Sequence, residues 1–406
     1  GDFNGDGKDD VIVGAFGDDN NGIVSGSAFI FFGGITGTKN ADTDADVILN
    51  GQSASDSFGH SVASAGDFNG DGKGDVIVGA YADDNNSALS SGSAFIFFGG
   101  ITGTKRADAD ADVILNGQSA ADNFGAQVAS AGDFNGDGKS DVIVGAHGDD
   151  NNSALSSGSA FIFFGGITGT KTADTDADVI LNGQSADDLF GRSVASAGDF
   201  NGDGKDDVIV GAPLDDNNSA SASGSAFIFF GGITGTKRAD TDADVILDGQ
   251  SAGDRFGGSV ASAGDFNGDG KGDIIIGARF DDNNSATDSG SAFIFFGGIT
   301  GTKRADADAD VIINGWGVSL SGGKFGESVA SAGDFNGDGK SDVIIGASGE
   351  DSTGIGSGRA YIFFGGITGT KSANTDADVI LNGQNAADNF GAQVGSAGDF
   401  NGDGKS

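Results

Sequence analysis

The sequence contains no cysteine and no methionine, and it has one proline, one tryptophan and two histidines among 406 residues. The absence of cysteine excludes a disulfide framework and thiol chemistry within this chain. Basic residues are scarce as well, because 21 Lys and Arg stand against 60 Asp and Glu, which gives a formal net charge of −39. So strong a negative charge argues against nucleic acid and anionic membranes as partners.

Long apolar runs are missing too. The longest extend over about five residues, as in residues 28–32, which is too short to cross a membrane, and no signal peptide is visible. We therefore expect no insertion into a membrane. The chain has no initiator methionine, and it begins and ends inside the same motif, so we expect it to be a processed or excised part of a longer array.

Motifs for catalysis are also absent from the sequence. No Gly-x-Ser-x-Gly elbow, phosphate-binding loop or zinc-ligand spacing occurs, and His60 and His147 lie in different kinds of connection with no visible set of partners. Carboxylate pairs such as Asp83-Asp84 resemble the acid and base of a glycosidase. They recur from repeat to repeat, however, whereas an active site breaks the symmetry of a repeat. We therefore expect a protein that is not an enzyme.

What the sequence has in abundance is glycine, with 77 residues, and a repeated nine-residue motif, Asp-Phe-Asn-Gly-Asp-Gly-Lys-x-Asp. Oxygen-bearing side chains at its first, third, fifth and ninth positions, with glycine at the sixth for a positive φ, match what Ca²⁺ requires of a short loop. Three carboxylates within nine residues repel one another unless a cation neutralises them. We predict that each copy is a calcium-binding loop; the alternative is an acidic turn that binds nothing. The copies begin at Asp2, Asp67, Asp133, Asp199, Asp265, Asp334 and Asp399.

A strand, rather than a helix, is predicted to follow each loop. A helix-loop-helix calcium site places a Glu at position twelve, but counting from Asp67 this position is Val78, in a β-branched run typical of a buried strand. The predicted ligands are the four side chains and the carbonyl oxygen of the motif's lysine, whose ammonium is expected to point to water. They are Asp2, Asn4, Asp6, Lys8, Asp10, Asp67, Asn69, Asp71, Lys73, Asp75, Asp133, Asn135, Asp137, Lys139, Asp141, Asp199, Asn201, Asp203, Lys205, Asp207, Asp265, Asn267, Asp269, Lys271, Asp273, Asp334, Asn336, Asp338, Lys340, Asp342, Asp399, Asn401, Asp403 and Lys405.

The motif spacings of 65, 66, 66, 66, 69 and 65 residues show that the chain is built from internal repeats. In the second repeat we predict strands over residues 75–80, 93–98, 112–115 and 124–130, and no window shows a helical stripe. Four short strands repeated in this way are typical of β-propeller blades. A β-solenoid, the competing architecture, normally repeats over fewer residues per coil. We predict one all-β domain over residues 1–406, a propeller of four-stranded blades.

At this level of detail the repeats resemble the FG-GAP repeats of the integrin α-subunit amino-terminal propeller and its bacterial relatives. The Phe-Gly pairs begin at Phe58, Phe124, Phe190, Phe256, Phe325 and Phe390. The Gly-Ala pairs begin at Gly14, Gly79, Gly145, Gly211, Gly277 and Gly346. The proline of the family is present once, as Pro213. The resemblance implies a propeller whose calcium loops join the first and second strands of each blade and lie on one face.

The number of blades and the binding face follow partly from the same resemblance. The chain offers six blade equivalents of about 66 residues, whereas the family usually has seven, so part of a seven-bladed ring is the alternative. The connections expected on the face opposite the calcium loops carry most of the variation, as at Tyr81, His147, Pro213 and Arg279. Variable loops on a repeated scaffold commonly form a recognition surface, although neutral drift of exposed loops predicts the same variation. We expect a protein or polysaccharide ligand there, or further copies of the chain itself.

One connection differs from all the others, and it contains the only tryptophan, Trp316, within residues 315–324. An exposed tryptophan is a good anchor for a sugar or a protein, although Trp316 would equally suit a gap in the ring or a contact with a neighbouring domain. Because many calcium loops of modest affinity suit the calcium concentration outside cells, we expect a secreted or cell-surface, non-enzymatic adhesion or scaffold module. The alternatives are a self-assembling unit of an extracellular filament or sheath, and the accessory propeller of a secreted hydrolase or lyase.

Overall fold

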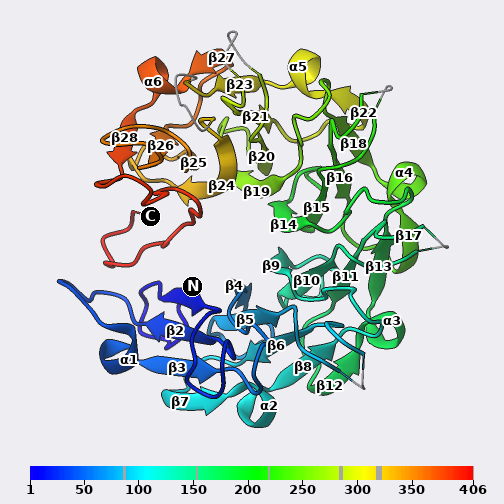
Figure 1. The fold of residues 1–406 in the computed structure, drawn as a ribbon, viewed down its shortest axis with the longest axis vertical. Helices are drawn as coiled ribbons and strands as arrows, with labels where there is room; N and C mark the ends of the chain where they lie inside the picture. The colour runs from blue at the N-terminus through cyan, green and yellow to red at the C-terminus, as the bar shows by residue number, and fades with distance from the viewer. Residues whose placement is uncertain (86–87, 152–153, 218–219, 283–286, 317–321, 406) are drawn as a thin grey trace. The chain divides into compact units, whose positions relative to one another are not determined.

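The computed structural model describes residues 1–406 except 86–87, 152–153, 218–219, 283–286, 317–321 and 406, and the regular secondary structure of the described part is mainly β-strand (Figure 1). The prediction of an all-β fold is confirmed. The chain divides into two compact units. The first comprises Gly1–Val194, Gly231–Thr241 and Ala397–Gly404, and the second comprises Ala195–Phe230, Asp242–Ser396 and Lys405–Ser406. None of the described helices has the length and apolar composition that crossing a membrane requires.

Three sheets belong to the first unit. The first sheet has the order β1 (Val11–Ala15), β2 (Ser27–Phe31), β3 (Val47–Asn50) and β7 (Gly103–Arg106). The second has the order β4 (Ser61–Gly66), β5 (Asp75–Ala80), β6 (Ser93–Phe97), β8 (Val113–Asn116) and β12 (Gly169–Thr172). The third has the order β9 (Gln127–Gly132), β10 (Asp141–Ala146), β11 (Ser159–Phe163), β13 (Val179–Asn182) and β17 (Gly235–Arg238).

The other three sheets lie in the second unit, apart from the first two residues of β14. The fourth sheet has the order β14 (Ser193–Gly198), β15 (Asp207–Ala212), β16 (Ser225–Phe229), β18 (Val245–Asp248) and β22 (Gly301–Arg304). The fifth has the order β19 (Ser259–Gly264), β20 (Asp273–Ala278), β21 (Ser291–Phe295), β23 (Val311–Asn314) and β27 (Gly369–Ser372). The sixth has the order β24 (Phe325–Gly333), β25 (Asp342–Ala347), β26 (Arg359–Phe363) and β28 (Val379–Asn382).

Each repeat also contains one four-residue helical turn that the sequence did not predict. These turns are α1 (Ala41–Asp44), α2 (Ala107–Asp110), α3 (Ala173–Asp176), α4 (Ala239–Asp242), α5 (Ala305–Asp308) and α6 (Ala373–Asp376). A single turn is too short to show an amphipathic stripe, which is why the pattern of apolar residues gives no sign of it.

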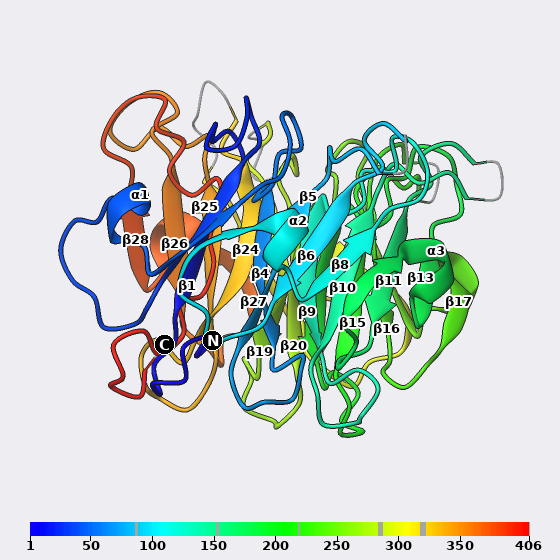
Figure 2. The ribbon, with the colours of Figure 1, turned by 90° about the horizontal axis from the view of Figure 1, so that it is seen from below.

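The continuous apolar run of β5 is explained by burial on both faces of its sheet. Every residue of β5 is buried, and the strand pairs antiparallel with β4 on one side and β6 on the other (Figure 2). Strands covered on both faces read as unbroken hydrophobic segments instead of alternating ones. In the first unit, Phe95 and Phe97 of β6 join Val47 and Leu49 of β3 in one buried cluster, so sheets of adjacent repeats pack face to face. Six such blade-like sheets, counted over the described residues, agree with the predicted propeller.

Four of the six sheets contain a fifth strand, which corrects the expectation of four strands per blade. In the second sheet this strand is β12, which pairs parallel with β8 and is supplied by the following repeat. The connection to β12 includes the Gly-Gly turn after β11. Each sheet from the second to the fifth is therefore completed by a segment of the next repeat, and the first sheet likewise receives β7 from the second repeat.

Candidate metal-binding loops

The nine-residue motif lies where the sequence placed it, between the first and second strands of a sheet. In the second repeat it runs from Asp67, directly after β4, to Asp75, the first residue of β5. Gly70 and Gly72 have φ values of 80° and 88°, a left-handed conformation that explains why glycine stands at these two positions. The loop is thus a tight turn between the partly buried β4 and the fully buried β5, which fixes the position of its acidic side chains.

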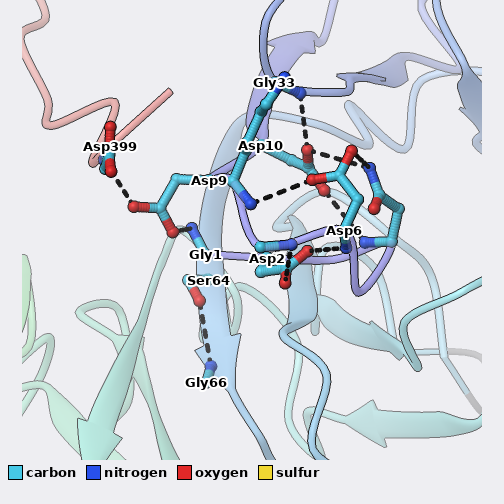
Figure 3. A network of polar contacts seen from close by, with 12 residues as sticks. Gly1, Asp2, Asp6, Asp9, Asp10, Gly33, Ser64, Gly66 and Asp399 are labelled. Carbon is cyan, nitrogen blue, oxygen red and sulfur yellow. Dashed lines mark hydrogen bonds and ion pairs between the residues drawn. The ribbon is translucent and has the colours of Figure 1, made fainter. Parts of the chain in front are cut away.

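The first carboxylate of the motif holds the loop together through backbone donors. Asp67 Oδ1 accepts from the N–H groups of Gly70 (2.8 Å) and Asp71 (2.9 Å), and Asp67 Oδ2 accepts from the Gly72 N–H (2.9 Å). Figure 3 shows Asp2 in the corresponding place in the first repeat, where it accepts from the N–H groups of Gly5, Asp6 and Gly7. The aspartate therefore organises the backbone of the loop.

The remaining oxygen-bearing side chains contact each other or the next connection. The Asn69 side-chain amide donates to Asp71 Oδ2 (3.1 Å), and the Asn69 backbone N–H donates to Asp75 Oδ2 (3.1 Å). The other oxygen of Asp75 accepts from the Gly99 N–H (2.8 Å). The ninth position thus ties the loop to the turn after β6, and the equivalent Asp10 accepts from Gly33 N–H (Figure 3).

Burial makes the ninth position electrostatically costly when no cation is near. Asp75 is 1% exposed, and its burial, together with the charge of Asp71, raises its pKa to about 6, although backbone hydrogen bonds oppose the rise. The pKa values of Asp141 and Asp273 are raised to about 6 for the same reasons. A cation beside such a group would lower its pKa and favour its ionised form.

The residue types fit a calcium site, but their side chains do not converge. Within the described residues, no group of three or more His, Cys, Asp or Glu side chains is close enough to hold a metal ion. In the sixth loop, Asn336 Oδ1 is buried and has no hydrogen-bond partner, which is an available oxygen at the third ligand position. The donor set is therefore the one that Ca²⁺ prefers, and ion binding requires the acidic side chains to turn toward a common point.

The side chain of Lys73 lies close to two glycines, and the expectation that its ammonium points to water stays a prediction. A Cβ placed on Gly100 would lie 2.3 Å from Lys73 Nζ, and one placed on Gly5 in the preceding loop would lie 3.4 Å from Lys73 Cε. Lys405 behaves similarly, since its Nζ donates to the Asn336 carbonyl (3.2 Å). A position beside a glycine of the preceding copy of the loop recurs for Lys139, Lys271, Lys340 and Lys405. The positive charge there partly offsets the carboxylates of that loop.

The last copy of the motif packs against the first repeat within the first unit. The Asp399 N–H donates to Asp9 Oδ2 (2.6 Å), and the Gly34 N–H donates to the Phe400 carbonyl (2.7 Å) (Figure 3). The same bond joins Gly100 N–H to the Phe3 carbonyl (2.7 Å). The loop at residues 399–405 therefore contacts the first repeat as the loop at residues 2–10 contacts the second.

A second set of acidic residues lies at the opposite ends of the strands. Asp83 is 3% exposed and accepts from the Ser93 hydroxyl (2.7 Å) and the Gln52 side-chain amide (3.1 Å). Burial and the charge of Asp83 raise the pKa of Asp56 to about 6, and the same causes, with Asp281 as the neighbour, raise that of Asp254 to about 7. These carboxylates fix the connections between strands, as expected for acidic pairs that recur in each repeat.

The sixth repeat replaces this acidic arrangement with an ion pair. Glu350 stands in the place of Asp83, and Arg359 stands in the place of Ser93, with Arg359 Nη1 3.4 Å from Glu350 Oε2. Tyr361 donates a short hydrogen bond to the same carboxylate. Burial raises the Glu350 pKa to about 7, while Tyr361 and Arg359 lower it. The sequence analysis missed this cluster, although the change from Ser-Ala-Phe to Arg-Ala-Tyr at residues 359–361 was a visible signal.

Trp316 lies beside this cluster and is 42% exposed, with the Arg359 guanidinium 5.6 Å from the centre of its ring. Residues 317–321 of its unusual connection lie outside the described residues.

The two histidines are structural by their surroundings: the His60 ring contacts Phe16 and Tyr81, and burial lowers the His147 pKa to about 4. Neither arrangement has the features of a catalytic centre.

The comparisons with known proteins agree with this geometry. The sequence profile of the FG-GAP repeat matches residues 58–97, 124–163, 190–229, 256–295 and 325–363. The chain carries FG-GAP repeats. Each matched segment begins at a Phe-Gly pair and ends in the third strand of a sheet, as with Phe58 and Phe97. The recognition of an FG-GAP propeller that resembles the integrin α amino-terminal domain is therefore confirmed.

Several relatives share these repeats. Integrin alpha-5 of Xenopus laevis is 33% identical over 244 residues, which is 59% of this chain and 21% of the relative. Integrin alpha-PS5 of Drosophila melanogaster is 31% identical over 206 residues, 49% of this chain and 18% of the relative. Phosphatidylinositol-glycan-specific phospholipase D of Bos taurus is 31% identical over 155 residues, 37% of this chain and 18% of the relative. The matches span about a fifth of the length of these relatives.

Proposed function

We propose that this FG-GAP chain is a calcium-binding, non-enzymatic module that acts outside the cell in adhesion or as a surface scaffold. The observation that carries the proposal is the loop between β4 and β5, in which Asp67 already holds three backbone N–H groups and thereby fixes the turn. Its counterparts recur in the other repeats, as with Asp133. The similarity to integrin α subunits supports the adhesive role.

In each loop, Ca²⁺ would be held by the side chains at positions one, three, five and nine and by the lysine carbonyl. In the second loop these are Asp67, Asn69, Asp71, Asp75 and the carbonyl oxygen of Lys73. The ion would supply positive charge where Asp75 and Asp71 repel each other, and it would replace the hydrogen bonds between neighbouring side chains. The side chain of Lys139, which lies close to Gly70 of this loop, would have to tolerate the added positive charge.

Calcium titration of the intact chain tests this part of the proposal. Calorimetric titration should show saturable heat with CaCl₂, and thermal unfolding should shift upward relative to chelator, since a ligand at 100 times its Kd stabilises the folded state by about 2.7 kcal/mol per site. Asp71→Asn should reduce the number of bound ions by one and leave the other loops unchanged. The same melting temperature with Ca²⁺ and with chelator would overturn calcium binding.

The ligand is proposed to bind at the strand ends opposite the calcium loops. There the connections differ most between repeats, and Trp316 offers a partly exposed aromatic ring next to a guanidinium. Screening the chain against extracellular-matrix proteins and polysaccharides, with Trp316→Ala as the comparison, tests this assignment. A ligand whose affinity is unaffected by Trp316→Ala and by changes at Tyr81 and Arg279 would place recognition elsewhere.

A second candidate function has support from one comparison. The similarity to phosphatidylinositol-glycan-specific phospholipase D suggests that repeats of this type accompany enzymes, so the chain would then be an accessory propeller of a secreted hydrolase or lyase. Sequencing the flanking gene for a catalytic domain distinguishes the two roles, since an adhesion module predicts none there.

A further inference from the structure

The dipeptide Asn-Gly recurs in two settings, and the structure holds it differently in each. In Asn-Gly, the glycine nitrogen reaches the side-chain carbonyl carbon of the asparagine with little hindrance, because glycine carries no Cβ. The attack closes a five-membered imide and releases ammonia, so its rate depends on what surrounds the two residues. The first setting is the nine-residue loop, with Asn4, Asn69, Asn135, Asn201, Asn267, Asn336 and Asn401. The second is the end of a strand, with Asn50, Asn116, Asn182, Asn314 and Asn382.

In the second loop, the groups that this reaction needs already contact the reacting atoms. The attacking nitrogen, Gly70 N, donates its hydrogen to Asp67 Oδ1 (2.8 Å), so a carboxylate is placed to accept the proton. The Asp71 backbone N–H donates to Asn69 Oδ1 (2.7 Å), the oxygen on which negative charge develops. The nitrogen that leaves, Asn69 Nδ2, donates to Asp71 Oδ2 (3.1 Å). Gly70 and Asp71 are exposed, so water reaches the site.

The same three contacts recur in the third, fourth and fifth loops. The glycine nitrogen lies 2.7–2.8 Å from the first aspartate of the loop, and the backbone nitrogen that donates to the asparagine oxygen lies 2.7 Å from it. The asparagine Nδ2 lies 2.9–3.1 Å from the carboxylate two residues on. The sixth loop differs in one contact. Gly337 N donates to Asp334 Oδ1 (2.7 Å), but Asn336 Oδ1 has no hydrogen-bond partner within the described residues.

At the strand ends, the glycine nitrogen donates to a carbonyl instead of a carboxylate. The Gly117 N–H donates to the Gly92 carbonyl (2.9 Å), a neutral oxygen that is a poor acceptor for a proton in transfer. Asn116 is the last residue of β8 and pairs with Ser93 of β6, which keeps its backbone extended, and Gly117 is buried. This setting therefore favours neither closure of the ring nor access of water. The same bond to a carbonyl is made by Gly51, Gly183, Gly315 and Gly383.

We propose that Asn69, Asn135, Asn201 and Asn267 are sites of self-catalysed deamidation, in which the loop itself supplies the proton acceptor and the hydrogen-bond donor to the oxyanion. In the second loop, a bond forms between Gly70 N and Asn69 Cγ while the proton of Gly70 N passes to Asp67. The bond between Asn69 Cγ and Nδ2 then breaks, and ammonia leaves with a proton from solvent, to which Asp67 returns its own. Water opens the imide at either carbonyl and gives aspartate or isoaspartate, so one amide and one water become one carboxylate and one ammonium ion.

The reaction changes the loop in a lasting way. Each event adds one negative charge to a loop that already carries three carboxylates, which increases their mutual repulsion. Isoaspartate also places an additional carbon atom in the backbone between residues whose positions are fixed by hydrogen bonds to the first aspartate. Chains that are not renewed should therefore accumulate altered loops in a fixed order, with the second to fifth loops before the sixth.

Peptide mapping of the intact chain tests this order. The folded chain is incubated at neutral pH with chelator in water enriched in heavy oxygen, which labels residues hydrolysed during the incubation, and is then digested with trypsin. Trypsin leaves Asn50 and Asn69 in one peptide, residues 40–73, so fragment mass spectrometry compares the two settings within one molecule. Asn69 should react at least about tenfold faster than Asn50 and than Asn336. Equal rates at Asn69 and Asn50 overturn the proposal.

Unfolding and one variant separate assistance by the loop from the chemistry of the dipeptide alone. In urea all Asn-Gly pairs should react at nearly one rate, and Asn69 in the folded chain should exceed that rate. Asp67→Asn keeps the shape of the side chain but removes the proton acceptor, so it should slow Asn69 about tenfold and leave Asn135 unchanged. A slow Asn50 in the variant shows that the neighbouring sheet is still folded. Asn69 reacting no faster in the folded parent than in urea overturns the proposal, whatever the folding of the variant.

Calcium provides a further comparison, and this part rests on the proposed function. An ion held by Asp67, Asn69 and Asp71 would withdraw their oxygens from the reacting atoms, so deamidation of Asn69 should be slower in CaCl₂ than in chelator. Equally fast reaction in both solutions would count against calcium binding and would still support deamidation assisted by the loop. Slow reaction at Asn69 in chelator would overturn the deamidation proposal alone, because no ion is then present to protect the loop.

Discussion

Replacing Arg359 with serine restores the residue found at this position in the second to fifth repeats, yet it should destabilise the sixth repeat. The Glu350 side chain is 3% exposed and the Arg359 side chain 15% exposed, and their nearest charged atoms are 3.4 Å apart. Removing one partner of a buried ion pair costs about 3–5 kcal/mol, since it leaves the other charge uncompensated. Because Arg359 retains some contact with water, we expect a loss in unfolding free energy near the lower limit, about 3 kcal/mol at pH 8.

The loss should depend on pH, with a sign that follows from the Glu350 pKa. Burial already raises this pKa to about 7, above its value in the unfolded chain, so the folded state binds the proton more tightly. Folding stability therefore rises as the pH falls from about 7 toward the unfolded pKa near 4.5. Below pH 5 the carboxyl is neutral and needs no guanidinium. Arg359→Ser should then cost about 1 kcal/mol, mainly through lost packing beneath Trp316.

Trp316 makes the measurement local, because it is the only tryptophan and lies against Arg359. Its fluorescence followed through urea unfolding at pH 8 and at pH 5 reports the sixth repeat, whatever the behaviour of the others. Glu350→Gln is the matched control, and combining it with Arg359→Ser should remove most of the pH dependence. An Arg359→Ser loss of equal size at pH 8 and pH 5 would refute the role assigned to the Glu350 charge.

Three further outcomes follow from the structure. Phe161→Ala should lower the unfolding free energy by about 3–5 kcal/mol, because Phe161 is 3% exposed and packs edge-on against Phe124. Asp137→Ala, in an exposed loop, should cost much less. Equal, negligible effects of the two substitutions in urea titrations would show that the strand of Phe161 is not part of the core. Trp316→Ala should change the melting temperature little, since an exposed cation–π contact is worth about 0.5–1 kcal/mol, and a loss of several kcal/mol would indicate a buried role instead. With a chelator present, Asp254→Asn should raise the unfolding free energy at pH 8, because the raised pKa of Asp254, about 7, means that its ionised form destabilises the folded state. The variant should also gain less unfolding free energy than the parent when the pH is lowered. A variant less stable than the parent at pH 8 would contradict this.

The strands that the sequence predicted are those whose apolar residues pack within or between sheets. The prediction for residues 75–80 coincides with β5, and those for 93–98 and 112–115 agree with β6 and β8 to within one residue at each end. The prediction for 124–130 began early, because Phe124 is fully buried but precedes β9, which starts at Gln127. Burial of a side chain and strand geometry of its backbone are separate properties, and the sequence pattern reports the first.

The fifth strands escaped prediction for a different reason. Residues 103–106 are Gly-Thr-Lys-Arg, with little apolar character and a mostly exposed surface, and they become a strand only because β3 offers a parallel edge. Such pairing is a property of two segments more than 50 residues apart, which local propensity does not contain. The nine-residue loops lie between strands, as their spacing predicted, and calcium binding by them stays a prediction. The path of Lys73 over the preceding loop, by contrast, depends on how neighbouring repeats pack.

The parallel strand that each later repeat supplies to the sheet before it also has a consequence for the chain as it leaves the ribosome. β8 is complete when Asn116 has been made, but its partner β12 begins at Gly169, so the edge of the second sheet waits while some 53 residues are added. At the usual 5–20 residues per second this delay is roughly 3–10 seconds. During that interval the Gly-Thr-Lys segments already made in the same chain have the same sequence as the partner that β8 awaits. Correct pairing between near-identical repeats thus depends on the order of synthesis and on how close each segment lies to its edge.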